Sequence, residues 1–348
     1  MTDPQAPSRP RPAPPGQRGV RIAGSGSFLP ERRLTNADLE RMMDTSDEWI
    51  IQRTGIRERR MIDPSKGEST YTMSAAALKS ALADAKMDPT EIDLLIEATV
   101  CAEMPCPSTA CRVAQAVGLG TAPAFDITAA CCGFVYGLNL AHDLVMAGNY
   151  RTVAVIGAET LTQYMDYTTE GRGTAILFGD AAGAAIIRAT DDTSKGIMAQ
   201  VMHAQGSGWK DLYIPRKLDR DLPPGVDPTT HKCGIMYMNG REVFKFAVTT
   251  FQELIAQTLE KAGLRAEQVD HYICHQSNAR ILEAARERFG LPREKLYVNI
   301  DRVGNTSAAS VPVCLDELRK SGRVHEGQIA MFVAFGGGLT WASSLWQL

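Results

Sequence analysis

Three side chains suited to nucleophilic catalysis each follow a predicted strand and precede a predicted helix. Cys131 lies between a predicted strand, AFDI, and a predicted amphipathic helix that begins near Gly133. At a helix N-terminus, free N–H groups and the helix dipole favour negative charge, so we expect a lowered thiol pKa and a stronger nucleophile. His275 closes the apolar segment HYICH, and Asn305 opens the segment NTSAAS. A thiol, an imidazole and a carboxamide can together form an acyl-enzyme and stabilise developing negative charge.

The glycine-rich segment Ala334–Gly338, AFGGG, is a fourth candidate component. Three consecutive glycines let a backbone approach a ligand closely and present N–H donors to an oxyanion. Each of the four features also has a structural interpretation: a buried Cys, a hydrogen-bonded His, an Asn that caps a helix, and a tight turn.

An internal repeat predicts how these residues meet. Leu82–Ile96 resembles Leu259–Ile273, and the two copies are separated by the same offset at both ends (259 − 82 = 273 − 96). Each copy follows a helical pattern of apolar residues, at Tyr71–Ala85 and Phe244–Ala262, and continues into a short turn and a buried strand. We therefore predict an α/β fold with mixed sheets, in which two similar halves bring the ends of their strands together.

The rest of each half is predicted to follow the same order. The first half should contribute a helix, a strand and two further strands, at Thr109–Val117, Ala124–Ile127, Thr152–Gly157 and Ala181–Ile187. The second half should contribute their counterparts at Asn278–Phe289, Lys295–Ile300, Gln328–Phe335 and Thr340–Trp346. We expect a disordered Pro-rich tail over residues 1–18, an N-terminal half over 19–190 that carries the nucleophile, and a C-terminal half over 191–348 that carries His275 and Asn305.

Composition argues against several functional classes. The chain has 348 residues and a net charge of −3, without the basic excess typical of nucleic-acid-binding proteins. Its longest apolar runs fall far short of the roughly 20 residues of a membrane helix, and its N-terminus has no secretory signal pattern. The chain is too long and too apolar to need disulfides and shows no export signal, so we expect its eight cysteines to be reduced cytoplasmic thiols. They include no CxxC pair, so we expect no metal site.

Longer motifs resemble one family closely. TAACCGF around Cys131 is similar to the nucleophile motif of the β-ketoacyl-acyl carrier protein synthase III family, the thiolase-fold condensing enzymes that initiate fatty-acid synthesis. Further similar segments are RTGIRER, GRGTAILFGDAAGAA, NGREVFKFAV, HQSNARI, DRVGNTSAASVP and AFGGGLTW. The resemblance covers nearly everything after the tail. It implies two thiolase-like halves with mixed five-stranded sheets and buried central helices in αβαβα layers, and a homodimer.

The resemblance also implies a reaction. Cys131 would take the acyl group of an acyl-coenzyme A, which is a substrate, so no cofactor is expected. Malonyl-acyl carrier protein would then lose carbon dioxide while His275 and Asn305 stabilise the enolate, which attacks the acyl-Cys. Backbone N–H groups of Cys131 and Gly337 would form the oxyanion hole.

Other residues carry over from the same resemblance. The resemblance implies that the substrate is bound by Trp49, Arg53, Arg172, Phe244, Asn278 and Arg280. The acyl pocket would be formed by Cys106, Phe178 and Phe335. Carrier-protein docking falls on Arg280, Arg286 and Arg288, although a solvated helix face explains these arginines equally well.

Three features depart from the family pattern. Cys132 replaces a small residue such as Ala, and we interpret it as a filler beside the nucleophile. Cys106 stands where Phe is common, so the pocket should admit longer or branched primers. Gly206–Cys233 is long and Pro-rich, typical of either a flap at the tunnel or a surface loop.

Several alternatives stay open at this point. A thiolase-fold acyltransferase, or a condensing enzyme of a secondary-metabolite pathway, would share Cys131. A hydroxymethylglutaryl-coenzyme A synthase would need an acidic residue near Val100, and Glu103 is close to that position. A papain-like hydrolase fits the α/β repeat poorly, and an inactive partner subunit would typically lack the nucleophile.

Overall fold

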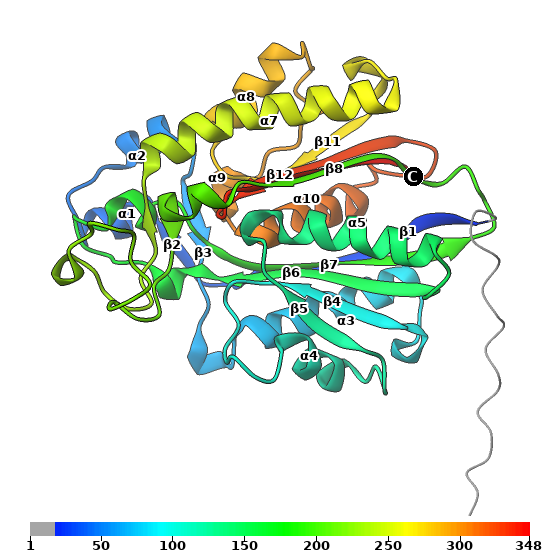
Figure 1. The fold of residues 1–348 in the computed structure, drawn as a ribbon, viewed down its shortest axis with the longest axis horizontal. Helices are drawn as coiled ribbons and strands as arrows, with labels where there is room; N and C mark the ends of the chain where they lie inside the picture. The colour runs from blue at the N-terminus through cyan, green and yellow to red at the C-terminus, as the bar shows by residue number, and fades with distance from the viewer. Residues whose placement is uncertain (1–17) are drawn as a thin grey trace, which may run out of the picture.

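Two β-sheets enclose a pair of buried helices, and further helices cover the outer face of each sheet. The computed structural model describes residues 18–348. Figure 1 shows the resulting layers, with α7 and α8 outermost on one side, α5 and α10 in the centre and α3 and α4 outermost on the other. The fold class predicted from the sequence, an α/β arrangement of two similar halves, is confirmed.

The first sheet contains strands from residues 19–190 only. Its order is β1-β7-β6-β4-β5, formed by Gly19–Phe28, Asp180–Thr190, Thr152–Thr160, Leu94–Ala98 and Ala124–Ile127. Strands β4, β5 and β6 run parallel, which requires crossover helices on the faces of the sheet. These helices are α3, α4 and α5, at Thr70–Ala85, Thr109–Val117 and Gly133–Met146.

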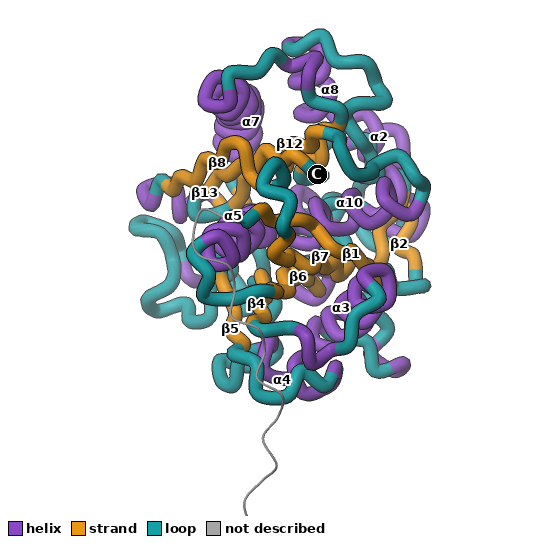
Figure 2. Tube along the Cα trace, turned by 90° about the vertical axis from the view of Figure 1, so that its right-hand side faces the viewer, coloured by secondary structure: helices purple, strands orange, loops and turns teal. Residues whose placement is uncertain are grey.

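The second sheet contains strands from residues 196–347. Its order is β11-β12-β13-β8, formed by His271–Cys274, Ile329–Gly336, Thr340–Gln347 and Gly196–Ala204. Its helices are α7, α8 and α10, at Gly240–Ala262, Ala279–Arg288 and Ser310–Lys320. Figure 2 shows α5 and α10 between the two sheets, where their apolar residues share one core.

The offset of the sequence repeat extends through the whole fold. The same offset relates the starts of β1 and β8, of α5 and α10, and of β6 and β12 (196 − 19 = 310 − 133 = 329 − 152). The two halves therefore place the turn before α5 and the turn before α10 at equivalent positions, and these turns carry Cys131 and Ser307.

Two glycines let the central strands reach those turns. A Cβ added at Gly157 on β6 would lie 2.2 Å from the Ala308 oxygen, and one at Gly336 on β12 would lie 2.6 Å from the Cys131 nitrogen. Any side chain at either position would push a strand away from the turn that it supports.

One predicted strand is wrong. Lys295–Ile300 forms only an isolated bridge, Tyr272 with Leu296, so the second sheet has four strands where five were expected. The Gln276 side-chain oxygen accepts the backbone N–H groups of Asn299 at 3.0 Å and Ile300 at 3.3 Å. These donors are therefore not available to extend a strand, and a short helix, α9, begins at Ile300.

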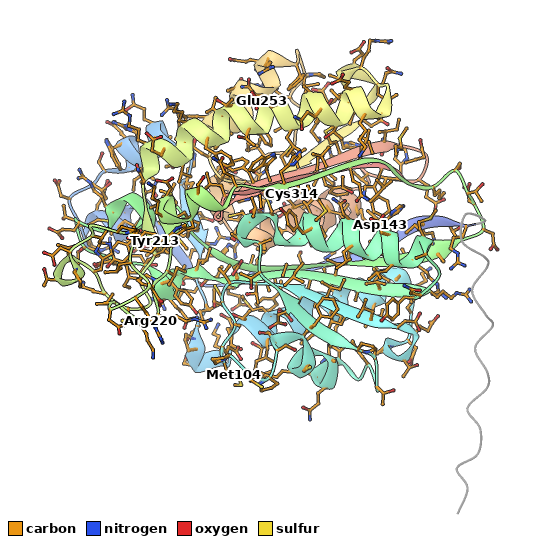
Figure 3. All side chains as sticks on the ribbon, viewed as in Figure 1. Met104, Asp143, Tyr213, Arg220, Glu253 and Cys314 are labelled. Atoms are coloured by element: carbon orange, nitrogen blue, oxygen red, sulfur yellow. The ribbon has the colours of Figure 1, made fainter. Side chains whose placement is uncertain are left out.

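The shorter elements lie at one end of the molecule. They are β2, β3, α1, α2, α6 and α9, at Arg33–Thr35, Glu58–Arg60, Asn36–Glu40, Asp47–Thr54, Arg172–Ala175 and Ile300–Val303. The long connection before α7 lies at the same end, where Figure 3 shows Tyr213 and Arg220, far from Asp143. Within it, β9 and β10, at Leu212–Tyr213 and Tyr237–Met238, form a small two-stranded antiparallel sheet.

The predicted tail is only partly covered by the structure. Residues 1–17 lie outside the described residues, so their disorder stays a prediction. Arg18 is buried, and its guanidinium donates to the Val145 oxygen at 3.3 Å. Arg18, which the predicted tail included, therefore belongs to the folded part.

Candidate active site

Cys131 lies in a tight turn directly before α5. The turn spans Ala130–Cys132, and Ala130 has the unusual backbone angle φ = 46°. A non-glycine residue in this left-handed region stores strain and is often found at functional sites. The turn aims the Cys131 side chain into the space between the two halves, where it is 6% exposed.

The expected lowering of the Cys131 pKa is wrong for the free protein. Burial raises the pKa of this thiol to about 12. A thiolate loses its hydration in this position, which disfavours the charged form. The resting nucleophile is therefore a thiol, and the reaction must remove its proton.

His275 follows β11 and is 1% exposed. Its Nδ1 lies 2.7 Å from the Ser310 hydroxyl oxygen, which also lies 2.8 Å from the Ser307 carbonyl oxygen. Burial lowers the pKa of His275 to about 3, so its ring is neutral. The Ser310 hydroxyl donates to the Ser307 carbonyl oxygen, so in this arrangement Nδ1 carries the imidazole proton and donates to Ser310. When the Ser310 hydroxyl turns to Nδ1 instead, the imidazole proton is on Nε2 and can be donated to a ligand.

Asn305 follows α9 and is held by its main chain. Its N–H donates to the Leu177 oxygen at 2.8 Å, and its carbonyl accepts the Gly179 N–H at 3.0 Å. The side-chain Oδ1 accepts the Ser307 N–H at 2.9 Å. Because the amide oxygen is already used, the Nδ2 group is left as a donor.

The three predicted catalytic residues line one cavity. Cys131, His275 and Asn305 surround a space of about 110 Å³, together with Phe178, Phe244, Asn278 and Phe335. This places polar groups and one nucleophile on a largely apolar lining, the usual composition of a ligand site.

A second cavity of about 590 Å³ adjoins the nucleophile. Cys131, Phe178 and Gly337 line it, and it continues past Met104 toward Arg216. The long connection contributes Leu212, Tyr213, Ile214 and Met236, so part of Gly206–Cys233 covers this space. Thr340 Oγ1 lies 3.0 Å from the Ala129 oxygen and 3.1 Å from the Gly337 oxygen, so one hydroxyl joins the Cys131 turn to the glycine turn.

The residues predicted to hold the coenzyme cluster at the surface. Arg53 and Arg172 stack on the Trp49 ring, at 5.5 Å and 5.3 Å from its centroid. Asn278 connects this cluster to the first cavity, since its Nδ2 donates to the Arg53 oxygen at 3.0 Å. Arg280 lies 5.2 Å from the centroid of the Phe244 ring, which also lines that cavity.

The three arginines of α8 differ in their partners. Arg286 pairs with Glu283 and donates to the Leu291 oxygen at 3.0 Å, and Arg288 donates to Gln252 at 2.7 Å. Within residues 18–348, no carboxylate forms an ion pair with Arg280. Of the three, Arg280 is the one best placed to meet an acidic partner.

Two predicted positions lie apart from the first cavity. Cys106 is exposed and lines neither cavity, so its role in the acyl pocket stays a prediction. Cys132 is fully buried in the core between the sheets. Glu103 pairs with Arg112 and accepts the Tyr71 N–H at 3.2 Å, which leaves it poorly suited to act as a base.

Sequence reasoning missed three polar residues beside the site: Glu159, Ser307 and Ser310. Ser307 lies in the segment NTSAAS, and its φ of 50° is close to the 46° of Ala130, which holds the equivalent position in the first half. Glu159 ends the apolar strand segment VAVIGAE, where a carboxylate on a buried strand was a usable signal.

Two general features complete the description of the site. Among the described residues, no group of three or more His, Cys, Asp or Glu side chains could hold a metal ion. The same residues contain no helix with the length and apolar character needed to cross a membrane.

Known proteins share this chain's sequence and fold. The model for 3-oxoacyl-[acyl-carrier-protein] synthase III matches residues 125–206, and the model for its C-terminal part matches 259–348. The beta-ketoacyl-[acyl-carrier-protein] synthase III of Caldanaerobacter subterraneus subsp. tengcongensis is 47% identical over 93% of this chain and 96% of that protein. The structure of 3-oxoacyl-[acyl-carrier-protein] synthase III from Aquifex aeolicus VF5 has a TM-score of 0.87 and 42% identity, covering 95% of this chain and 100% of that one. The priming beta-ketosynthase from the R1128 polyketide biosynthetic pathway has a TM-score of 0.87 and 34% identity, covering 97% and 99%.

Proposed function

The chain belongs to the β-ketoacyl-acyl carrier protein synthase III family, and from that premise we propose that it condenses an acyl-coenzyme A with malonyl-acyl carrier protein. The product is a β-ketoacyl-acyl carrier protein, formed with loss of carbon dioxide, and the reaction initiates fatty-acid synthesis. One observation carries the proposal: Cys131, His275 and Asn305 line a single cavity.

The first half-reaction is acyl transfer to Cys131. The deprotonated sulfur attacks the thioester carbonyl, and the carbon–sulfur bond to coenzyme A breaks. The N–H groups of Cys131 and Gly337 are the proposed donors to the oxyanion, since β12 brings the glycine turn against Cys131. The Trp49 cluster suits the nucleotide end of coenzyme A, because a Trp ring stacks on adenine and guanidinium groups pair with phosphates.

The second half-reaction is decarboxylation and carbon–carbon bond formation. Loss of carbon dioxide places negative charge on the malonyl thioester oxygen. The Asn305 Nδ2 group is one neutral donor for that oxygen, and the His275 Nε2–H is the second once the Ser310 hydroxyl turns from Ser307 to Nδ1. The enolate carbon then attacks the acyl-Cys131 carbonyl, and the Cys131 sulfur leaves.

A role in a secondary-metabolite pathway is the second candidate. It is favoured by the likeness to the R1128 priming ketosynthase, which covers nearly all of both chains. The large cavity beside Cys131 also offers more room than an acetyl group fills. The chemistry at Cys131 is the same in both cases, and only the primer and the carrier protein differ.

We further propose a homodimer in the cytoplasm. Strand β5 is the edge of the first sheet, and Phe125 on it is exposed. An exposed edge strand with an apolar side chain is a natural pairing surface for a second copy.

All eight cysteines are free, as suits a reducing compartment.

Separate assays of the two half-reactions test the proposed function. We expect Cys131→Ala to abolish acylation by radiolabelled acyl-coenzyme A. His275→Ala and Asn305→Ala should each slow decarboxylation of malonyl-acyl carrier protein by roughly 10²–10³-fold, while acylation persists. Release of free acid as the main product would instead identify a hydrolase.

A further inference from the structure

Directly behind the nucleophile, a fully buried carboxylate is connected to it through one hydroxyl. Ser307 and Cys131 line the same cavity from the two facing turns, and the Ser307 hydroxyl donates to Glu159 Oε1 at 3.1 Å. Glu159 is the penultimate residue of β6 and has no exposed surface. The second oxygen, Oε2, accepts the Val100 N–H at 3.1 Å and the Thr99 hydroxyl at 3.4 Å.

Ser307 is held rigidly between the two groups. Its φ of 50° lies in the left-handed region, its N–H donates to Asn305, and its carbonyl oxygen lies 2.8 Å from the Ser310 hydroxyl. Because its hydroxyl hydrogen is directed at Glu159, its oxygen lone pairs remain to accept the thiol hydrogen. Thiol, hydroxyl and carboxylate therefore follow one another in the order that a proton path requires.

The surroundings favour Glu159 over His275 as the destination of that proton. Burial raises the pKa of Glu159 to about 7, whereas burial lowers the pKa of His275 to about 3. The titratable groups that face Glu159 are Glu97, Cys101, Cys131 and Tyr164. None of them is a cation that would hold the carboxylate in its charged form.

We propose that Glu159 is the positioning residue that receives the Cys131 proton through Ser307 during acyl transfer. The thiol proton moves to the Ser307 oxygen as the Ser307 proton moves to Glu159, and the sulfur keeps its electron pair. The sulfur bonds to the acyl carbon, and the departing coenzyme A sulfur takes a proton from solvent. When the enolate later expels the Cys131 sulfur, the same path returns the proton from Glu159.

This division of labour leaves His275 neutral throughout. Its one ring proton then stays available for the malonyl thioester oxygen, which Nε2 can reach as a donor once the Ser310 hydroxyl turns to Nδ1. The neutralised Glu159 also places no negative charge near the incoming malonyl carboxylate during the second half-reaction. The inference rests on the proposed function and concerns its first half-reaction only.

Glu159→Gln tests the proposal, because glutamine keeps the shape of the side chain but cannot accept the proton. We expect rapid-mixing acylation of wild type to accelerate with pH through a midpoint near 7. In Glu159→Gln it should fall by about 100-fold or more and lose that midpoint. Decarboxylation of malonyl-acyl carrier protein should stay within about threefold of wild type, and Glu159→Asp should restore part of the acylation rate.

Two further variants separate a proton path from a structural role. Ser307→Ala should lose acylation as Glu159→Gln does, and the equivalent residue Ala130 shows that alanine adopts this backbone angle. Glu97→Gln alters another fully buried carboxyl on the neighbouring strand and should leave acylation unchanged.

Two results would overturn the proposal. One is a Glu159→Gln enzyme with the acylation rate and pH midpoint of wild type. The other is an equal loss of acylation and decarboxylation, which would indicate that Glu159 only supports the fold of the site. Failure of wild type to form an acyl-enzyme at all would instead contradict the proposed function.

Discussion

His275 Nδ1 and the Ser310 hydroxyl oxygen lie 2.7 Å apart, and this contact decides which nitrogen of the imidazole faces the substrate. Ser310 begins α10, and His275 follows β11, so the contact depends on the packing of a central helix against the second sheet. Because the ring is neutral, its single proton is on Nε2 only while Ser310 donates to Nδ1.

Ser310→Ala should therefore weaken decarboxylation without affecting acylation. A buried nitrogen without its partner costs about 1–3 kcal/mol, and about 1.4 kcal/mol corresponds to a tenfold change in rate. We expect roughly a tenfold lower rate of carbon dioxide release from malonyl-acyl carrier protein. Ser25→Ala, which removes a buried hydroxyl bonded to Asp316 at 3.0 Å, is the matched control. Equal effects of the two variants would refute a specific role for Ser310.

Arg280→Ala should weaken use of the carrier protein. Arg280 has no ion-pair partner among the described residues, whereas Arg286 pairs with Glu283. We expect the KM for malonyl-acyl carrier protein to rise about tenfold in Arg280→Ala at low salt, and the difference to shrink as ionic strength rises. Arg286→Ala should have a smaller effect. If the KM for malonyl-coenzyme A rises equally, Arg280 binds the small substrate and not the protein.

Glu97→Gln should stabilise the protein at alkaline pH. Burial raises the pKa of Glu97 to about 8 in the folded state, although Ser74 donates to it at 2.7 Å. Its neutral form is favoured by folding, so its contribution to stability is present below the unfolded pKa and is lost as pH rises through about 8. Urea unfolding should show that the free energy of unfolding falls more between pH 6 and pH 9 for wild type than for Glu97→Gln, by a few kcal/mol.

Glu287→Gln on the exposed face of α8 is the control for this comparison. Its free energy of unfolding should match that of wild type at both pH 6 and pH 9. Parallel pH profiles for wild type and Glu97→Gln would show that Glu97 does not titrate in the folded protein.

Cys106→Phe should narrow the range of primers. The cavity of about 590 Å³ beside Cys131 is several times the roughly 150 Å³ that accommodates benzene. A larger residue at position 106, reaching across the proposed dimer, would fill part of it. We expect acylation by octanoyl-coenzyme A to fall more than tenfold while acetyl-coenzyme A is unaffected, with Cys111→Ser as the control. Exclusive use of acetyl-coenzyme A by wild type would contradict this account.

Much of the fold could be predicted because the spacing of apolar residues within one segment indicates whether that segment is a helix or a strand. The apolar positions of α3 and α7 predicted both helices, and the constant offset between the two copies of the repeat predicted two similar halves. The prediction of a strand at Lys295–Ile300 was wrong because a side chain distant in sequence, Gln276, accepts the backbone N–H groups that a strand would use. Such a tertiary contact has no signature in the segment itself.

The site was predictable in its residue types and not in its electrostatics. Cys131, His275 and Asn305 could be found from motifs and strand ends. The pKa of Cys131 depends on burial between the two halves, which no local pattern reports, so its predicted direction was wrong. Glu159 was overlooked for a related reason, since its link to the nucleophile exists only once β6 meets the turn before α10.

Mass spectrometry of the intact protein tests the central claim most directly. Wild type incubated with acyl-coenzyme A should gain the mass of one acyl group, and peptide mapping should place that group on Cys131. Addition of malonyl-acyl carrier protein should then remove the group and yield β-ketoacyl-acyl carrier protein, while Cys132→Ala behaves as wild type. Acylation that persists in Cys131→Ala, or an acyl-enzyme that malonyl-acyl carrier protein does not discharge, would contradict the account.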